Sequence, residues 1–203
     1  GAGPFVFAVD TGFTGVVVSD RIAPQIKAKL LSSSIIANII TPLGEVIGEP
    51  ISINEIKIGN SSFKKMHGIG IPDYVFDIFR FEIDGVLGLA LFRDCILEID
   101  YGRKRLNIKK SLDSIGIPED AIAANFTIDS IYITGTLLNQ KLTFMLDTGC
   151  EFGVSVLRKY KDDLEFKGDP EKLTYATLSG SMEILRYTLN GDMLLGKKVY
   201  HEP

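Results

Sequence analysis

The sequence has little of what marks several classes of protein. Its two cysteines, Cys95 and Cys150, are too few for a disulfide framework, although a single bridge and two free thiols are both open. A formal net charge of −4 argues against a nucleic-acid-binding surface, and no apolar run reaches the roughly 20 residues of a membrane span. The only histidines, His67 and His201, show no pairing with a cysteine that would indicate a thiol nucleophile.

What the sequence does contain is a series of short segments rich in Ile, Val, Phe and Thr, bounded by Gly, Pro, Asn or Asp. This pattern is typical of β-strands. Strands are predicted at residues 4–10, 15–19, 34–41, 49–59, 95–101, 105–109, 125–135 and 141–147. Helical patterns are limited to a short helix in 20–31 and one or two turns in 89–95 and 155–164. We therefore predict an all-β fold with minor helix.

The tripeptide Asp-Thr-Gly occurs twice, at residues 10–12 and 147–149, and each copy ends an apolar run. A strand would carry the Asp into the interior, and Gly would let the backbone turn without a side chain in the way. Two carboxylates on duplicated units can face each other and perform acid–base chemistry. For a single copy, a structural Asp that caps backbone amides explains the pattern equally well.

Other landmarks keep the same spacing from the two motifs. Gly44 lies 34 residues after Asp10, and Gly180 lies 33 residues after Asp147; both are typical of hairpin tips. A further pair of glycines, Gly59 and Gly196, lies 49 residues after the respective aspartates. This register predicts an internal repeat.

The repeat divides the chain into a first unit at residues 1–110 and a second at 125–203. Residues 111–124 are polar, lose the strand pattern and are predicted to be a linker. The first unit also contains an apolar-apolar-Gly step at residues 86–88, whose counterpart is expected near position 223. We therefore expect the sequence to be a segment of a longer protein, with one strand missing at the front and the second unit incomplete.

Together, the strand ending in Asp-Thr-Gly, the later Gly-bearing hairpin and the apolar-apolar-Gly step resemble the aspartic peptidases. The short repeats are similar to retropepsin-type lobes, and their tandem arrangement is similar to bacterial aspartyl protease family proteins. The resemblance implies two acid-protease lobes related by a pseudo-two-fold axis, the second apparently truncated. It also implies hydrolysis of peptide bonds by an aspartic endopeptidase through a water activated by an Asp dyad, with no metal and no cofactor.

The resemblance assigns roles to particular residues. The catalytic pair would be Asp10 and Asp147, which would share one proton because two close carboxylates do not both ionise. The residues implied to support the dyad are Thr11, Gly12, Thr148, Gly149, Val86, Leu87 and Gly88, with the threonine hydroxyls bonding across the lobe junction. The residues implied to form substrate-binding flaps are Thr41, Leu43, Gly44, Leu178, Ser179 and Gly180.

The sequence also departs from the family pattern. A small residue often follows the motif glycine, whereas Phe13 and Cys150 stand there in this chain, and Phe13 is bulky enough to reshape the site. The expected partner is an extended peptide or unfolded protein, with no nucleic acid and no membrane span; a homodimer is a further possibility. A periplasmic, cell-envelope or secreted location fits such an enzyme. The alternative function is a non-catalytic peptide-binding or scaffolding module that retains the fold.

Overall fold

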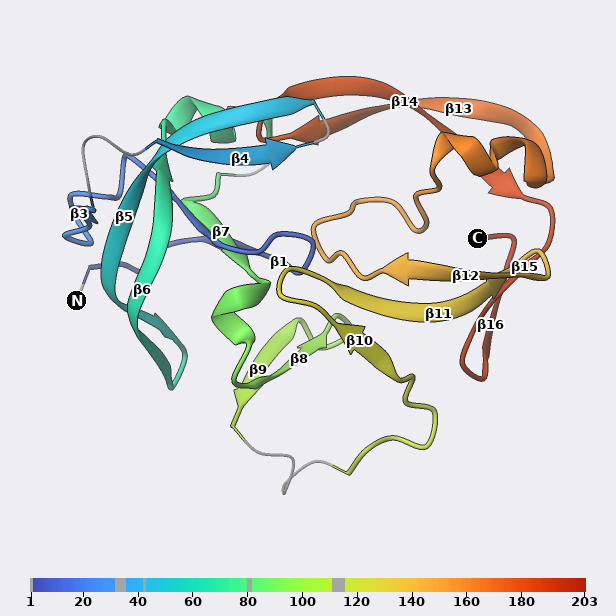
Figure 1. The fold of residues 1–203 in the computed structure, drawn as a ribbon, viewed down its shortest axis with the longest axis horizontal. Coiled ribbons are helices and arrows are strands. Elements are labelled where there is room, and N and C mark those ends of the chain that lie inside the picture. Colours follow the sequence, from blue (N-terminus) through green and yellow to red (C-terminus); the bar gives the residue numbers. More distant parts are fainter. Residues whose placement is uncertain (1, 32–35, 42, 80–81, 111–115) are drawn as a thin grey trace.

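The structure is a computed structural model that describes residues 2–31, 36–41, 43–79, 82–110 and 116–203 (Figure 1). Strands dominate it, as the sequence predicts. In the N-terminal half the elements are β1 (Phe7–Asp10), β2 (Val16–Ser19), β3 (Lys29–Leu30), β4 (Ala37–Thr41), β5 (Gly44–Ile58), β6 (Ser61–Ile71), η1 (Asp73–Ile78), β7 (Gly85–Gly88), η2 (Leu89–Phe92), β8 (Ile96–Asp100) and β9 (Arg105–Lys109). In the C-terminal half they are β10 (Ala124–Phe126), β11 (Ile131–Leu137), β12 (Gln140–Met145), η4 (Arg158–Asp163), β13 (Phe166–Thr177), β14 (Gly180–Leu189), β15 (Asp192–Leu195) and β16 (Lys198–His201).

The N-terminal half is organised around a seven-stranded sheet in the order β1-β7-β2-β6-β5-β3, with β4 also paired to β5. Its central strand β2 (VVVS) is buried along its whole length, because β7 and β6 flank it on both edges. Continuous Val is what a strand buried on both faces requires. The short strand β1 pairs in parallel with β7, with Asp10 opposite Gly88.

The C-terminal half contains a five-stranded sheet in which β11 pairs with β10 and β15 on one side and with β12 on the other. Strand β12 runs toward Asp147, as β1 runs toward Asp10. Strands β13 and β14 form a separate long hairpin.

Two apolar clusters fill the N-terminal half and a smaller one fills the C-terminal half. The second N-terminal cluster includes Val17, Ile39, Ile71 and Val86 from four different strands. The C-terminal cluster has only Leu137, Leu164, Leu189 and Met193 as buried members. The N-terminal half thus has the larger core.

The predicted helix at residues 20–31 is wrong. The segment instead forms successive turns that lead into β3. Two features oppose a helix: Pro24 has no backbone N–H to donate, and Lys27 adopts a left-handed φ of 52°. The turns predicted near residues 89–95 and 155–164 are confirmed as the short 3-10 helices η2 and η4.

Two further sequence expectations meet the structure here. Cys95 and Cys150 are both free and partly buried, so the alternative of a disulfide is wrong. Residues 111–115 of the predicted linker lie outside the described residues, and 116–123 carry no strand. Within the part of the chain that the structure describes, no helix is long and apolar enough to cross a membrane.

Two hairpins, β4–β5 and β13–β14, extend toward each other along one side of the molecule (Figure 1). Their tips are in contact, and the Thr41 and Ser179 hydroxyls form a hydrogen bond there. Leu178, at the tip of the C-terminal hairpin, packs against the cluster of Val17, Ile39 and Ile71 in the N-terminal half. The hairpins thus join the two halves at a point far in sequence from both motifs.

Ile71 offers a test of the N-terminal core. Its side chain is fully buried, whereas Ile40, on the outer face of β4, is 82% exposed. Ile71→Ala should lower the free energy of unfolding by about 2–5 kcal/mol through lost burial and a residual cavity, and Ile40→Ala by less than about 0.5 kcal/mol. Urea unfolding followed by circular dichroism measures both, and equal losses would contradict this packing.

Candidate active site

The two Asp-Thr-Gly turns have the same internal geometry. The Gly12 amide donates to Asp10 Oδ1 at 2.8 Å, and the Gly149 amide donates to Asp147 Oδ1 at 2.8 Å. In each turn the amide of the following residue donates to the backbone oxygen of the aspartate at 3.3 Å. Each carboxylate is therefore fixed by its own turn.

Reciprocal threonine hydrogen bonds connect the turns. The Thr11 amide donates to Thr148 Oγ1 at 3.0 Å, and the Thr148 amide donates to Thr11 Oγ1 at 3.1 Å. Each hydroxyl also donates onward, Thr11 to the Leu146 carbonyl at 2.9 Å and Thr148 to the Val9 carbonyl at 2.8 Å. The threonines predicted to join the two turns therefore do so in the structure.

Each carboxylate also packs against the glycine of the opposite motif. A Cβ added to Gly12 would lie 2.5–2.7 Å from the carboxyl atoms of Asp147, and one added to Gly149 would lie 2.6–2.9 Å from those of Asp10. Contacts this short are not tolerated, so glycine is required at both places. The structure thus gives a spatial reason for both motif glycines.

Asp10 and Asp147 interact directly. Burial most of all, and then the neighbouring carboxyl group of Asp147, raise the pKa of Asp10 from 3.8 to about 6. The amides of Gly12 and Phe13 oppose this rise, because they donate to the charged form. Asp10 therefore keeps its proton at mildly acidic pH.

Strand β7 supports the Asp10 turn, as the sequence predicts for residues 86–88. Val86 and Leu87 are buried in the core, and the amides of Gly88 and Leu89 donate to the carbonyls of Gly15 and Phe13, each at 2.7 Å. Gly88 has no room for a Cβ against the backbone of this turn. The backbone beneath the first motif is therefore held from two sides.

The predicted flap residues lie at the two hairpin tips. Gly44 and Gly180 adopt left-handed φ values of 130° and 134°, which explains glycine at both turns. The Leu43 amide donates to Thr41 Oγ1 at 3.2 Å, and the Ser179 amide donates to Thr177 Oγ1 at 3.3 Å. The tips are thus similar turns, each closed by a threonine.

Sequence reasoning missed Tyr175, on β13. Its pKa is raised by burial and then by the negative charges of Cys150, Asp147 and Asp10, which places the ring close to the carboxyl pair. The ring packs against Phe152 with centroids 5.7 Å apart. One sequence signal was available, because Tyr175 lies five residues before the predicted tip glycine Gly180. The residue at the same position in the first unit, Ile39, is a core residue and so does not indicate a site.

The two residues that depart from the family pattern lie in different surroundings. Phe13 packs against the N-terminal core cluster, so much of its bulk is directed into that core. Cys150 donates its thiol hydrogen to the Phe152 carbonyl at 3.2 Å. Among the described residues, no group of three or more His, Cys, Asp or Glu is arranged to hold a metal ion.

Thr148 provides a direct test of the junction. Thr148→Val removes the hydroxyl that accepts from Thr11 and donates to Val9. Because two backbone groups lose their partner, the free energy of unfolding should fall by about 1–3 kcal/mol. Thr148→Ser keeps the hydroxyl and serves as the matched control in urea titrations. A Val variant as stable as the Ser variant would show that these bonds do not hold the turns together.

Comparison with protein-family models gives a match. Residues 1–91 match the protein-family model described as "Aspartyl protease". The matched region contains the first motif, the β4–β5 hairpin and β7. No curated protein matches the chain. The match over residues 1–91 supports an aspartyl protease of the retropepsin-like family.

Proposed function

We propose that the chain is an aspartic endopeptidase that hydrolyses peptide bonds with a water molecule activated by Asp10 and Asp147. The observation that carries this proposal is the closeness of the two carboxyl groups, each of which lies against the glycine of the opposite Asp-Thr-Gly motif. The family match over residues 1–91 supports a protease-type hydrolase. Both carboxyl groups belong to one chain, so the pair does not depend on a second copy.

In the proposed reaction the pair begins with one proton. The ionised carboxylate takes a proton from a water molecule placed between the two groups, and the water oxygen attacks the scissile carbonyl carbon. The protonated carboxyl donates its proton to the carbonyl oxygen, which gives a tetrahedral intermediate. The roles then reverse: the carboxyl that took the water proton protonates the leaving nitrogen as the C–N bond breaks, and the other, now ionised, takes a proton from a hydroxyl of the intermediate as the C=O bond reforms.

The proposed substrate is an extended peptide bound between the carboxyl pair and the two hairpin tips. Such a peptide binds by strand-like main-chain hydrogen bonds, with alternate side chains in pockets. Tyr175 lies near the pair and is placed to contact the substrate on the C-terminal side. Opening the tips requires breaking the Thr41–Ser179 hydrogen bond. A binding module without turnover would not need a proton-sharing pair, so this geometry favours the enzyme.

Replacing either aspartate tests the pair. Asp10→Asn and Asp147→Asn should each lower kcat/KM by at least about 10²–10⁴-fold, because neither amide can exchange a proton with water. Cleavage of a peptide library or of an unfolded protein measures the effect. The exposed Asp77→Asn serves as the control and should retain full activity. Activity that survives in both site variants would exclude the pair as the catalytic groups.

The pKa of about 6 at Asp10 sets the pH dependence. Above this pH the pair loses its shared proton, so kcat/KM should fall about tenfold per pH unit. Stability should change in the same direction: between about 4 and 6 the folded chain keeps a proton that the unfolded chain has lost, so the free energy of unfolding falls as pH rises. Asp10→Asn should remove this decline. An activity that increases from pH 6 to 8 would contradict the assignment.

A further inference from the structure

The outer face of the β4–β5 hairpin exposes three isoleucines. Ile36 is 68% exposed, Ile40 is 82% exposed and Ile47 is 63% exposed. On the opposite face of the same hairpin, Ile39 and Val46 are buried in the N-terminal core. An antiparallel sheet that packs one face on a core normally presents polar side chains on the other. This hairpin is apolar on both faces.

The strand register brings these side chains together. Ile40 lies opposite Glu45, and Ile47 lies opposite Asn38. The Asn38 side-chain amide donates to Glu45 at 3.0 Å, so residues on this diagonal of the hairpin are in contact. The same diagonal relates Ile36 to Ile47, because successive side chains on one face of a strand are two residues apart. The outer face therefore has an isoleucine pair next to a fixed amide–carboxylate pair, with Ile40 beyond it.

The second hairpin shows that the fold does not require isoleucine at these places. Counted back from the two tips, Lys172, Ala176 and Glu183 occupy the places of the three isoleucines. Lys172 and Glu183 form an ion pair of 3.0 Å, and their side chains are 71% and 62% exposed. The same hairpin geometry is thus formed with a polar outer face. The isoleucines of the first hairpin need another reason.

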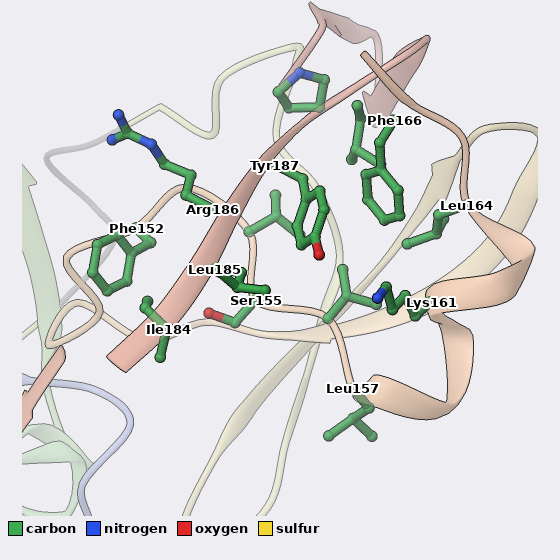
Figure 2. A pocket seen from close by; sticks show the side chains of 14 residues that line it. Phe152, Ser155, Leu157, Lys161, Leu164, Phe166, Ile184, Leu185, Arg186 and Tyr187 are labelled. Atoms are coloured by element: carbon green, nitrogen blue, oxygen red, sulfur yellow. The ribbon is translucent and has the colours of Figure 1, made fainter. Parts of the chain in front are cut away.

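The apolar residues of the second hairpin have surroundings in their own half of the chain. Ile184 and Leu185 line a cavity of about 330 Å³ that is also lined by Leu157 and Leu164 (Figure 2). None of the three isoleucines of the first hairpin lines this cavity, and all three remain mostly exposed. Their exposure is therefore a property of the first hairpin alone.

Charge indicates the chemistry of what covers this face. Residues 36–49 include Glu45 and Glu49 and contain no Lys, Arg or His. Both glutamates are exposed, and neither forms an ion pair with a described residue. The bond from Asn38 holds the Glu45 carboxylate at the centre of the face. An apolar and cationic cover complements this surface, whereas a second copy of the same face would bring like charges together.

We infer that the outer face of the β4–β5 hairpin is a docking surface for a basic amphipathic helix of a partner protein. The apolar stripe of the helix lies on Ile36, Ile40 and Ile47, and its flanking Lys or Arg side chains reach the two glutamates. A helix is about 10 Å across and the two strands are about 4.8 Å apart, so one helix covers both strands. A helix packed on a sheet is also a common way to bury an apolar sheet face.

A model peptide provides the test. The probe is a labelled helical peptide of about 14 residues, with Leu at spacings of three and four and Lys on both sides of the Leu stripe. The matched control has Glu in place of every Lys. In fluorescence polarisation against the full chain, the Lys peptide should bind saturably and the Glu peptide at least about tenfold more weakly. Mass spectrometry of the recovered peptides checks that they are intact. No saturable binding, or equal binding of both peptides, would overturn the inference.

Protein variants locate the binding on the hairpin. The double variant Ile40→Thr, Ile47→Thr keeps β-branched residues that favour strands but removes apolar surface. It should weaken binding of the Lys peptide at least about tenfold. Ile117→Thr, at a side chain that is 73% exposed and lies outside the hairpin, is the matched control and should leave binding unchanged. Equal binding by the double variant and the unchanged chain would contradict the docking surface.

A charge swap separates loss of the contact from loss of folding. Glu45→Lys combined with Glu49→Lys should weaken binding of the Lys peptide at least about threefold, because two exposed ion pairs are lost. The same variant should bind the Glu peptide at least about threefold more tightly than the unchanged chain does. A variant that binds neither peptide differently from the unchanged chain would show that the glutamates take no part.

Two other outcomes would reject the helix as the occupant. Sedimentation that shows self-association of the chain, abolished by Ile40→Thr with Ile47→Thr, would assign the face to a second copy. Binding to phosphatidylcholine vesicles that is lost in the same variant would assign it to a membrane surface. Because every readout is binding and not cleavage, failure here is distinguishable from failure of the proposed protease activity.

Discussion

The reciprocal hydrogen bonds of Thr11 and Thr148 are the constraint on which the rest of the site depends. Each hydroxyl accepts a hydrogen bond from the backbone amide of the opposite threonine. The Thr11 hydroxyl also donates to the carbonyl of Leu146 and the Thr148 hydroxyl to that of Val9, the residues that directly precede the two motifs. The strands that carry the two aspartates are therefore tied together at their ends. Only then can each carboxylate lie against the glycine of the other motif and share a proton.

The two halves support this junction unequally. Beneath Asp10, β7 pairs in parallel with β1 and its glycine lies against the backbone of the turn. Beneath Asp147, the segment 154–157 has no strand partner among the described residues. The first turn therefore has a parallel strand beside its aspartate in addition to the threonine bonds, whereas the second has the threonine bonds and the pairing of β12 with β11.

The strands could be predicted because they depend on local apolar patterns, whereas the contacts of the two motifs were predicted from the family resemblance. Alternating and continuous apolar runs indicated β1, β2 and β5, and the equal glycine spacing indicated the hairpin tips. The turns in 20–31 were missed because apolar spacing was given more weight than Pro24. The contacts of Leu178 and Tyr175 could not be predicted, because packing between residues 100 or more positions apart produces no periodic pattern in the sequence. Their roles follow only from where the hairpins meet.

The contact between the two hairpin tips involves the N-terminal core, so opening the tips also disturbs that core. Opening the tips breaks the Thr41–Ser179 hydrogen bond and withdraws Leu178 from the N-terminal cluster. Full burial of a leucine side chain stabilises by about 1.5–3 kcal/mol, and Leu178 is only partly buried, so opening costs less than this for the side chain. A net hydrogen bond adds about 0.5–1.5 kcal/mol. The closed arrangement is thus favoured by a few kcal/mol at most, small enough for the tips to separate and form their contact again.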